Sequence, residues 1–383
     1  MTNNHHVVMV HGLLGFGPKE LGPFKYWGTA FEVAPAGLVH EASVGPISSA
    51  HDRACELAAQ IKGTSVDYGA QHADRAGHRR EGSDFRAKGF VPDWSEANPV
   101  HLVGHSLGSP TVRCLQHLLE QDYWGWGSNH RWVASITTIS GVSNGSTLTY
   151  RFGANEKTGI LKESGIPGSL MRMIYMYMYA VHPIHGIVYD FDLEHWDLEP
   201  VSGESLIGYL LRVAQSRFMK EKDNACYSLT LQGAYADNKL WETYSDTVYL
   251  SHITEQTFCD PFSQYSYPTL AMNPALQLAA VYIGTKEFVR PPISVPGFQS
   301  SDWWENDGLV STYSQMYPHT NGHHPVGGEF SDDTPTGHFE PGKWYYQWER
   351  DMDHLDICLS PEPWQINRQR RFYANLFRRL AEL

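Results

Sequence analysis

The sequence offers little that would support a disulfide framework or a nucleic-acid surface. Its five cysteines are scattered, odd in number and never arranged as Cys-x-x-Cys, so mostly buried free thiols are expected. With 29 Lys and Arg against 42 Asp and Glu, the formal net charge is −13, which excludes nucleic acid as an expected partner. The one basic segment, RQRRFYANLFRRL, carries Phe372, Leu376 and Leu380 at helical spacing. It therefore indicates a packed helix with its arginines on the solvated face.

Long hydrophobic runs are also missing. A membrane-spanning helix needs about 20 successive apolar residues, whereas the longest candidate, MIYMYMYAV, soon reaches His182 and Pro183. The first residues, MTNNHHVVMVHG, contain no charged region followed by an apolar stretch and a cleavage site. The sequence therefore predicts neither a membrane span nor a signal peptide, and it leaves the compartment and the oligomeric state open.

What is present is typical of a large α/β protein. Hydrophobic residues make up 42% of the 383 positions, which is ample for a core. Short apolar runs alternate with helical segments such as AHDRACELAAQIKG and TVRCLQHLLEQ. This alternation predicts a mostly parallel sheet with helices on both faces. The predicted strands are HVVMV, PVHLVG, WVASITTIS, YSLTLQGA and TVYLSHIT.

Two regions depart from that alternation. Residues from about 46 to 95 are polar and include VDYGAQHADRAGH, in which His72 and His78 stand six positions apart with little apolar material around them. Residues from about 150 to 222 carry LMRMIYMYMYAVHPIHG, whose methionines and tyrosines fit either a core helix or a mobile lid over an apolar ligand. We expect one domain over residues 1–383 with these two regions as insertions.

The most informative segment is PVHLVGHSLGSPTVRCL. An apolar strand leads into Gly104-His105-Ser106-Leu107-Gly108, and an amphipathic helix follows directly. A serine on a tight turn between strand and helix needs small neighbours, because the turn brings backbones close. The helix then directs its N–H groups and its positive dipole end toward developing negative charge. The strand before and the helix after favour Ser106 as a nucleophile.

A nucleophilic serine needs a base and a residue that orients it, and in this strand order the acid and then the histidine follow the serine. Asp307, in WENDGLVSTYS, and His354, in DHLDI, have that order. Asp-Gly is also a common turn pair, and the chain has 20 histidines, so spacing alone does not choose them. The oxyanion donors are expected to be the backbone N–H groups of Leu107 and of Leu13 in VVMVHGLLGFG.

Several of these segments occur together in a known family. They are VHGLLGFG with FKYWG, VGPISSAHDRACE, VDYGAQHADRAGH, GHSLG, SITTISG, WENDGLVSTYS and DHLDI. In them the chain resembles the zinc-containing lipases of thermophilic bacilli and their staphylococcal and plant relatives. The similarity runs from the first strand nearly to the end, and VGPISSAHDRACE with VDYGAQHADRAGH is far more specific than Gly-x-Ser-x-Gly alone.

The resemblance implies an α/β-hydrolase fold and a triacylglycerol lipase activity. It implies Ser106 as the nucleophile, His354 as the base and Asp307 as the residue that orients the base. It also implies the backbones of Leu13 and Leu107 as the oxyanion donors, a role that tolerates changes of side chain.

The same resemblance explains the two histidines. In this family an aspartate on the preceding helix, both histidines and a later aspartate bind zinc, and the matching residues here are Asp52, His72, His78 and Asp223. Four nitrogen and oxygen ligands without an open position are typical of a structural zinc site. The metal would hold the polar insertion to the end of the lid region, in place of a core.

Two cysteines near those ligands leave alternatives open. Cys55 follows Asp52 by three residues, and Cys226 follows Asp223 by three. If each pair is helical, a thiol lies on the same face as each proposed ligand. Two alternatives therefore stay open: a cysteine could replace an aspartate as a zinc ligand, or Cys55 and Cys226 could form a disulfide.

The chain departs from the family in two further places. Members often bind calcium through a Glu and an Asp after the catalytic histidine. Here the shorter Asp356 stands first and no aspartate stands near Ser360-Pro361-Glu362, which leaves a calcium site open. Gly104 replaces an alanine and Leu107 a polar residue of the bacillus enzymes, a change beside the nucleophile that bears on acyl-chain preference.

We therefore expect a serine hydrolase of carboxylic esters, a triacylglycerol lipase acting on lipid at a lipid–water interface. A carboxylesterase for short soluble esters is the first alternative, and a catalytically silent, zinc-stabilised binding protein is the second. A catalytic zinc hydrolase is disfavoured because the four ligands leave no open position.

Overall fold

The computed structural model describes residues 3–18, 20–162, 191–320, 324–359, 361 and 363–383. The Met- and Tyr-rich segment expected as a core helix or a lid, residues 170–186, lies outside them. In the ranges that are described, no helix has both the length and the apolar character needed to span a membrane.

A seven-stranded sheet in the order β10-β11-β7-β6-β5-β1-β2 forms the centre of the molecule. Every neighbouring pair in it is parallel, which confirms the predicted mostly parallel sheet. Its strands are β1 (Val7–Val10), β2 (Val39–Ala42), β5 (Val100–His105), β6 (Val133–Ile139), β7 (Val248–Glu255), β10 (Val326–Glu329) and β11 (Trp344–Arg350). Two antiparallel pairs lie outside it, β3 (Ser65–Asp67) with β4 (Glu81–Asp84) and β8 (Thr257–Cys259) with β9 (Ser266–Pro268).

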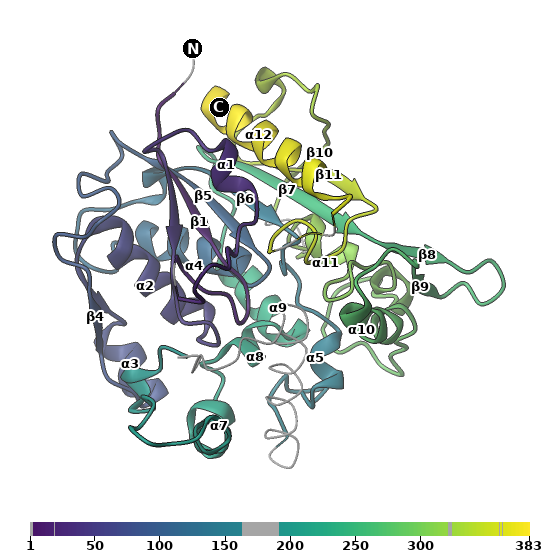
Figure 1. Cartoon of the computed structure of the whole chain (residues 1–383), viewed down its shortest axis with the longest axis horizontal. Helices are drawn as coiled ribbons and strands as arrows, with labels where there is room; N and C mark the ends of the chain where they lie inside the picture. Colours follow the sequence, from purple (N-terminus) through teal and green to yellow (C-terminus); the bar gives the residue numbers. More distant parts are fainter. Residues whose placement is uncertain (1–2, 19, 163–190, 321–323, 360, 362) are drawn as a thin grey trace.

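Helices cover both faces of this sheet (Figure 1). The helices α2 (Ala50–Lys62) and α4 (Gly108–Glu120) pack together on one face, and α1 (Ala30–Val33) and α12 (Ile366–Glu382) on the other. The other α-helices within the described residues are α3 (Ala70–Ala76), α5 (Leu148–Arg151), α7 (Leu206–Gln215), α8 (Ala225–Ser228), α9 (Leu231–Leu240), α10 (Pro274–Gly284) and α11 (Thr312–Met316).

Strand β1 shows why both faces must be covered. Val8 and Val10 belong to the apolar cluster under α2 and α4, whereas Val7 and Met9 belong to the cluster under α12. Successive side chains of a strand point to opposite faces, so an uninterrupted apolar run requires a layer on each side. All four side chains are at most 4% exposed.

One sequence prediction about these elements was wrong, and another was wrong at a single residue. The predicted strand YSLTLQGA is helical, because the Thr230 side chain accepts the N–H of Gly233 and caps the start of α9. The predicted C-terminal helix is present as α12, but Arg379 is not solvated. It is 3% exposed, donates to the carbonyls of Ser331 and Thr334 and stacks over Phe330 at 5.1 Å.

The two ends of the described chain meet beside α12. The N–H of Asn3 donates to the carbonyl of Ala381 at 2.7 Å, and the Asn3 side chain donates to the carbonyl of Leu380 at 2.9 Å. These bonds hold the residues that lead into β1 against the last turn of the final helix (Figure 1).

Candidate active site

Ser106 stands on a sharp turn where β5 ends and α4 begins. Its φ is +53°, a left-handed conformation that costs energy for a residue with a Cβ and is typical of a nucleophile held out of a strand. The neighbouring glycines are needed for space. A Cβ on Gly108 would lie 2.1 Å from the carbonyl oxygen of Val10, and a Cβ on Gly12 would lie 2.7 Å from the Cβ of Ser106.

The predicted acid and base are brought together from distant parts of the chain. His354 Nδ1 lies 2.8 Å from Asp307 Oδ2, and the Asp307 side chain is fully buried. The same oxygen accepts hydrogen bonds from Thr254 Oγ1 at 2.7 Å and from Gln315 Nε2 at 3.1 Å. Two backbone N–H groups of the following turn donate to its other oxygen. These four donors fix the carboxylate with Oδ2 toward His354 Nδ1, so Asp307 is placed to orient the imidazole.

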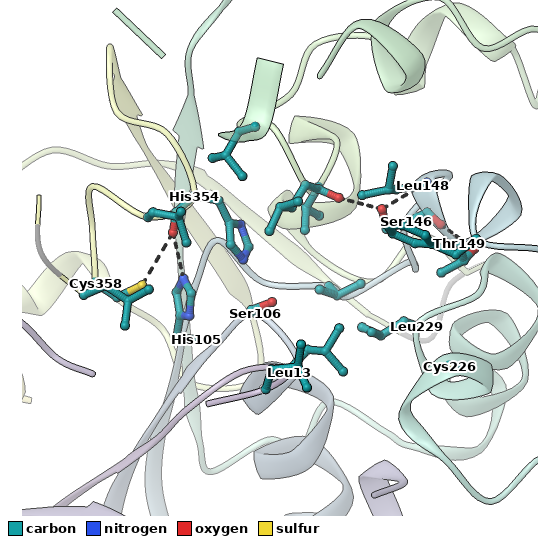
Figure 2. A pocket seen from close by; sticks show the side chains of 18 of the residues that line it. Leu13, His105, Ser106, Ser146, Leu148, Thr149, Cys226, Leu229, His354 and Cys358 are labelled. Atoms are coloured by element: carbon teal, nitrogen blue, oxygen red, sulfur yellow. Dashed lines mark hydrogen bonds between the residues drawn. The ribbon is translucent and has the colours of Figure 1, made fainter. Parts of the chain in front are cut away.

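Ser106 and His354 line one wall of a deep apolar pocket (Figure 2). The pocket encloses about 1060 Å³ of empty space, including its mouth. Its lining is mostly aliphatic and contains Leu13, Leu14, Val142, Leu148, Phe152, Leu161, Leu229, Leu276, Leu309 and Val310. A polar pair at the wall of such a cavity is suited to a substrate with one reactive polar group on an apolar body.

Both predicted oxyanion donors lie beside the serine. Leu107 follows it in the chain, and Leu13 lines the same pocket. Among the described residues, neither backbone N–H has an acceptor, so both can donate to a substrate oxygen. The loop of Leu13 is fixed by Arg53, which donates to the carbonyls of His11 and Gly45, and by the Leu14 N–H, which donates to Pro46 at 2.9 Å.

A hydrogen-bonded chain joins that loop to His354, the predicted base. The Gly12 N–H donates to the Tyr26 hydroxyl at 2.7 Å, and that hydroxyl lies 2.6 Å from His105 Nδ1. His105 Nε2 lies 3.3 Å from the carbonyl of His354. Burial, followed by the charge of His354, holds the pKa of His105 well below its usual value. The imidazole is therefore neutral, with Nε2–H donating to the carbonyl and Nδ1 accepting from Tyr26.

We expect Tyr26→Phe to lower kcat for ester hydrolysis about ten-fold, because a small misplacement of catalytic groups costs up to ~10²-fold in rate. The substitution leaves the Gly12 N–H and His105 Nδ1 without the Tyr26 hydroxyl, at a cost of about 1–3 kcal/mol in unfolding free energy. Steady-state kinetics and thermal melts measure the two effects separately.

The control is Tyr249→Phe. The hydroxyl of Tyr249 likewise accepts a backbone N–H, that of Tyr244, and donates to a side chain, Gln116, but it lines no part of the pocket. The Tyr249→Phe variant should lose a similar amount of unfolding free energy, whereas its kcat should be unchanged. Equal kcat losses in both variants would contradict a specific role for the Tyr26 chain.

The four predicted metal ligands also meet. One ligand atom from each of Asp52, His72, His78 and Asp223 lies within 4.8 Å of all the others. His72 Nε2 is 3.1 Å from Asp52 Oδ1 and 3.1 Å from Asp223 Oδ2, while His78 Nε2 is 3.8 Å and 3.2 Å from the same two oxygens. A tetrahedron with metal–ligand bonds of about 2.0–2.1 Å has edges of about 3.3 Å, so the set fits a four-coordinate cation.

The chemistry of the ligand atoms supports that fit. His78 Nδ1 lies 2.7 Å from the carbonyl of Arg79, which places the proton on Nδ1 and leaves Nε2 free to bind a cation. Nε2 is buried and makes no hydrogen bond within the described part of the chain. Burial lowers the pKa of His72, but its contacts with Asp223 and Asp52 outweigh burial and raise that pKa to about 9. The cluster therefore favours positive charge and could bind a metal ion.

Comparison with known proteins places the chain in a family. A family model described as "Lipase-like, C-terminal domain" matches residues 3–382. The chain belongs to this family. The lipase-like domain is 32% identical over 345 residues to Lipase 2 of Staphylococcus aureus, covering 82% of this chain and 45% of that protein. It is 31% identical to a lipase of Staphylococcus hyicus, covering 82% and 48%.

These matches confirm the predicted relationship to staphylococcal lipases, and the chain spans about half the length of those curated relatives. Solved structures agree on the fold of the lipase-like domain. EstA from Clostridium botulinum superposes with a TM-score of 0.80 at 29% identity, covering 100% of this chain and 88% of that one. The S. hyicus lipase superposes with a TM-score of 0.77 at 26% identity, covering 99% and 96%. The predicted α/β-hydrolase fold is confirmed.

The cysteine alternatives at the metal cluster do not hold in the lipase-like domain. Cys55 and Cys226 are both free, so they form no disulfide, and neither thiol belongs to the cluster. Cys55 Sγ lies instead 3.9 Å from His51 Nδ1. Burial raises the pKa of Cys226 to about 12 in the metal-free protein.

The calcium question lies partly outside the described residues, because positions 360 and 362 are not described. Asp356 accepts hydrogen bonds from the Asp353 N–H and from Gln365 Nε2. Within the described ranges, no group of three or more ligand side chains besides the Asp52 cluster could hold a metal ion.

Sequence reasoning missed residues that reach these sites from far along the chain. Tyr26 and His105 support the loop of Leu13, and Thr254 and Gln315 hold Asp307. His195 contacts the metal cluster at Asp52. The FKYWG segment marked Tyr26 as part of a matching motif, but no spacing rule connects any of these residues to its partner.

Proposed function

We propose that this lipase-like domain hydrolyses carboxylic esters, as a triacylglycerol lipase with Ser106 as its nucleophile. The observation that carries the proposal is the Asp307–His354 hydrogen bond, with His354 and Ser106 together on the wall of an apolar pocket. The names of the staphylococcal relatives, Lipase 2 and Lipase, point to the same activity.

The residues divide the reaction between them. Ser106 Oγ attacks the ester carbonyl carbon while His354 Nε2 accepts its proton, and Asp307 stabilises the imidazolium through Nδ1–H. The N–H groups of Leu13 and Leu107 donate to the oxygen that becomes negative. The alcohol leaves with the proton from His354, and water then cleaves the acyl-enzyme by the same route.

The pocket supports a fatty acyl group as the part of the substrate that binds. Together with its mouth it leaves about 1060 Å³ of empty space beside Ser106 and His354, and pockets of this apolar kind bind ligands with few polar groups. Its aliphatic lining would stabilise an acyl chain by about 0.8 kcal/mol for each buried CH₂. The net charge of −13 fits an uncharged lipid better than an anionic partner.

The test is hydrolysis of p-nitrophenyl esters from two to sixteen carbons and of an emulsified triglyceride. A triacylglycerol lipase should prefer the longer chains and act on the emulsion. Activity confined to short soluble esters would favour a carboxylesterase. No turnover, with no labelling of Ser106 by a serine-directed phosphonate, would overturn the proposal in favour of a silent binding protein.

We further propose that Asp52, His72, His78 and Asp223 hold a zinc ion of structural role. When bound, zinc supplies a cross-link between α2, α3 and the residues before α8. It would thereby fasten the region from about 46 to 95 to the end of the region from about 150 to 222, which we propose as insertions in a single domain. X-ray absorption at the zinc edge should show nitrogen and oxygen ligands only; sulfur would contradict this ligand set.

A further inference from the structure

The two carboxylate oxygens of Asp52 face different partners. Oδ1 faces the metal cluster, 3.1 Å from His72 Nε2. Oδ2 points away from it, 3.1 Å from Nε2 of a fifth residue, His195. Both side chains are almost completely buried, His195 at 1% and Asp52 at 0% exposure. Because an ionised carboxylate only accepts hydrogen bonds, His195 Nε2 must carry the proton and donate it.

His195 is itself held on three sides. Its ring stacks on Tyr68 with centroids 4.4 Å apart, and its Nδ1 lies 3.3 Å from the Tyr68 hydroxyl. That hydroxyl donates to Glu56 on α2 at 3.0 Å. The carbonyl of His195 accepts the N–H of Arg79 at 2.8 Å. The imidazole therefore has little freedom to turn away from Asp52.

We propose that His195 is a positioning residue for the metal site, and this rests on the metal site proposed above. By donating to Oδ2, His195 fixes the rotation of the Asp52 carboxylate and directs Oδ1 alone at the cation. A second hydrogen-bond partner of this kind orients a ligand and raises metal affinity. The donor comes from outside the four-ligand motif, 143 positions after Asp52.

The arrangement also couples the metal to the packing of the 191–198 segment. Phe191, Leu193, Trp196 and Leu198 are buried in one apolar cluster, and His195 is the polar side chain that this segment turns toward α2. Binding of the cation stabilises the Asp52 orientation that His195 recognises. By linkage, metal binding then stabilises the docked segment as well.

The test compares two substitutions at position 195. His195→Phe keeps a ring that can stack on Tyr68 but removes the N–H, whereas His195→Gln keeps an N–H donor. Zinc affinity is measured by competition with a chromophoric chelator on the full chain. We expect His195→Phe to weaken zinc binding by about 10- to 100-fold and His195→Gln to stay within about three-fold of wild type. The rise in Tm on adding zinc should be much smaller in His195→Phe than in wild type, and only slightly smaller in His195→Gln.

Trp196→Phe is the matched control. Trp196 lies in the same turn and packs on His78 with ring centroids 4.9 Å apart, but its Nε1 makes no hydrogen bond to any described residue. The zinc affinity of Trp196→Phe should stay within about three-fold of wild type, since no hydrogen bond that orients a ligand is lost. If His195→Phe does not fold, His195→Met supplies a second variant without a donor.

The outcomes separate this proposal from the one it rests on. Zinc affinity unchanged in His195→Phe, with only the metal-free protein melting earlier, would mean a structural role and overturn the proposal. Equal losses in the Phe and Gln variants would also overturn it. If the wild type binds no zinc, the metal site itself is wrong, and that result is visible before any variant is made.

Discussion

Replacing Ser106 by alanine should lower kcat for ester hydrolysis by about 10⁴- to 10⁶-fold, the range found when a serine nucleophile is removed. The loss follows from the site, because the Asp307–His354 pair would have no oxygen to activate. The residual rate comes from the oxyanion donors and the apolar pocket. Single-turnover kinetics on a p-nitrophenyl ester measures the acylation step directly.

The fold of this variant should be unchanged. Alanine keeps the Cβ of Ser106 and its left-handed φ of +53°, so the turn is neither relieved nor further strained. The Tm and the zinc content should match wild type. Ser109→Ala is a suitable control, since Ser109 Oγ donates to a backbone carbonyl, that of Gly104. Turnover at the normal rate in Ser106→Ala would remove Ser106 from the mechanism.

Removing the metal should produce the largest loss of stability. A ligand that binds only the folded state contributes about 4 kcal/mol when present at ~1,000 times its Kd. For a chain of this size we expect chelation to lower Tm on the order of 5 °C. Hydrolysis of a soluble ester below the melting range should be little changed, because no step of the reaction uses the cluster.

The chelation experiment has an internal check. Asp223→Ala deletes one ligand whose side chain is 12% exposed, so the variant should melt at the chelated value with or without chelator. Readdition of zinc should restore Tm in wild type alone. A wild-type Tm that does not respond to chelation, in protein shown to contain no metal, would contradict a structural ion at this place.

The sequence could predict those parts of the site that are formed by residues close together in the chain. The turn at Ser106 was predictable because strand, small residues and helix follow each other within one segment, and the glycines are required by contacts as close as 2.1 Å. His354 and Asp307 were different. Among 20 histidines no periodicity selects one, so the choice came from the family resemblance and not from the pattern.

Both errors have physical reasons, one local and one tertiary. In YSLTLQGA the apolar residues Leu229 and Leu231 alternate as in a strand, but the Thr230 side chain offers the next turn a helix cap. Arg379 lies at a position that reads as solvent-facing, yet carbonyls from a loop 45 to 48 residues earlier satisfy its guanidinium. Partners so distant in the chain are set by tertiary packing, which spacing rules do not describe.

Because the Asn3 N–H donates to the Ala381 carbonyl, these two residues are close enough in space to be joined by a short covalent linker. A linker of a few residues would join the two ends, and the covalent order could then be opened at an exposed turn such as Gly125–Gly127. If the ends were joined and the chain were not opened elsewhere, the unfolded state would lose conformational entropy. In a chain-entropy model this loss stabilises the folded state by on the order of 5 kcal/mol. The domain is therefore well suited to circular permutation and to insertion into a host protein.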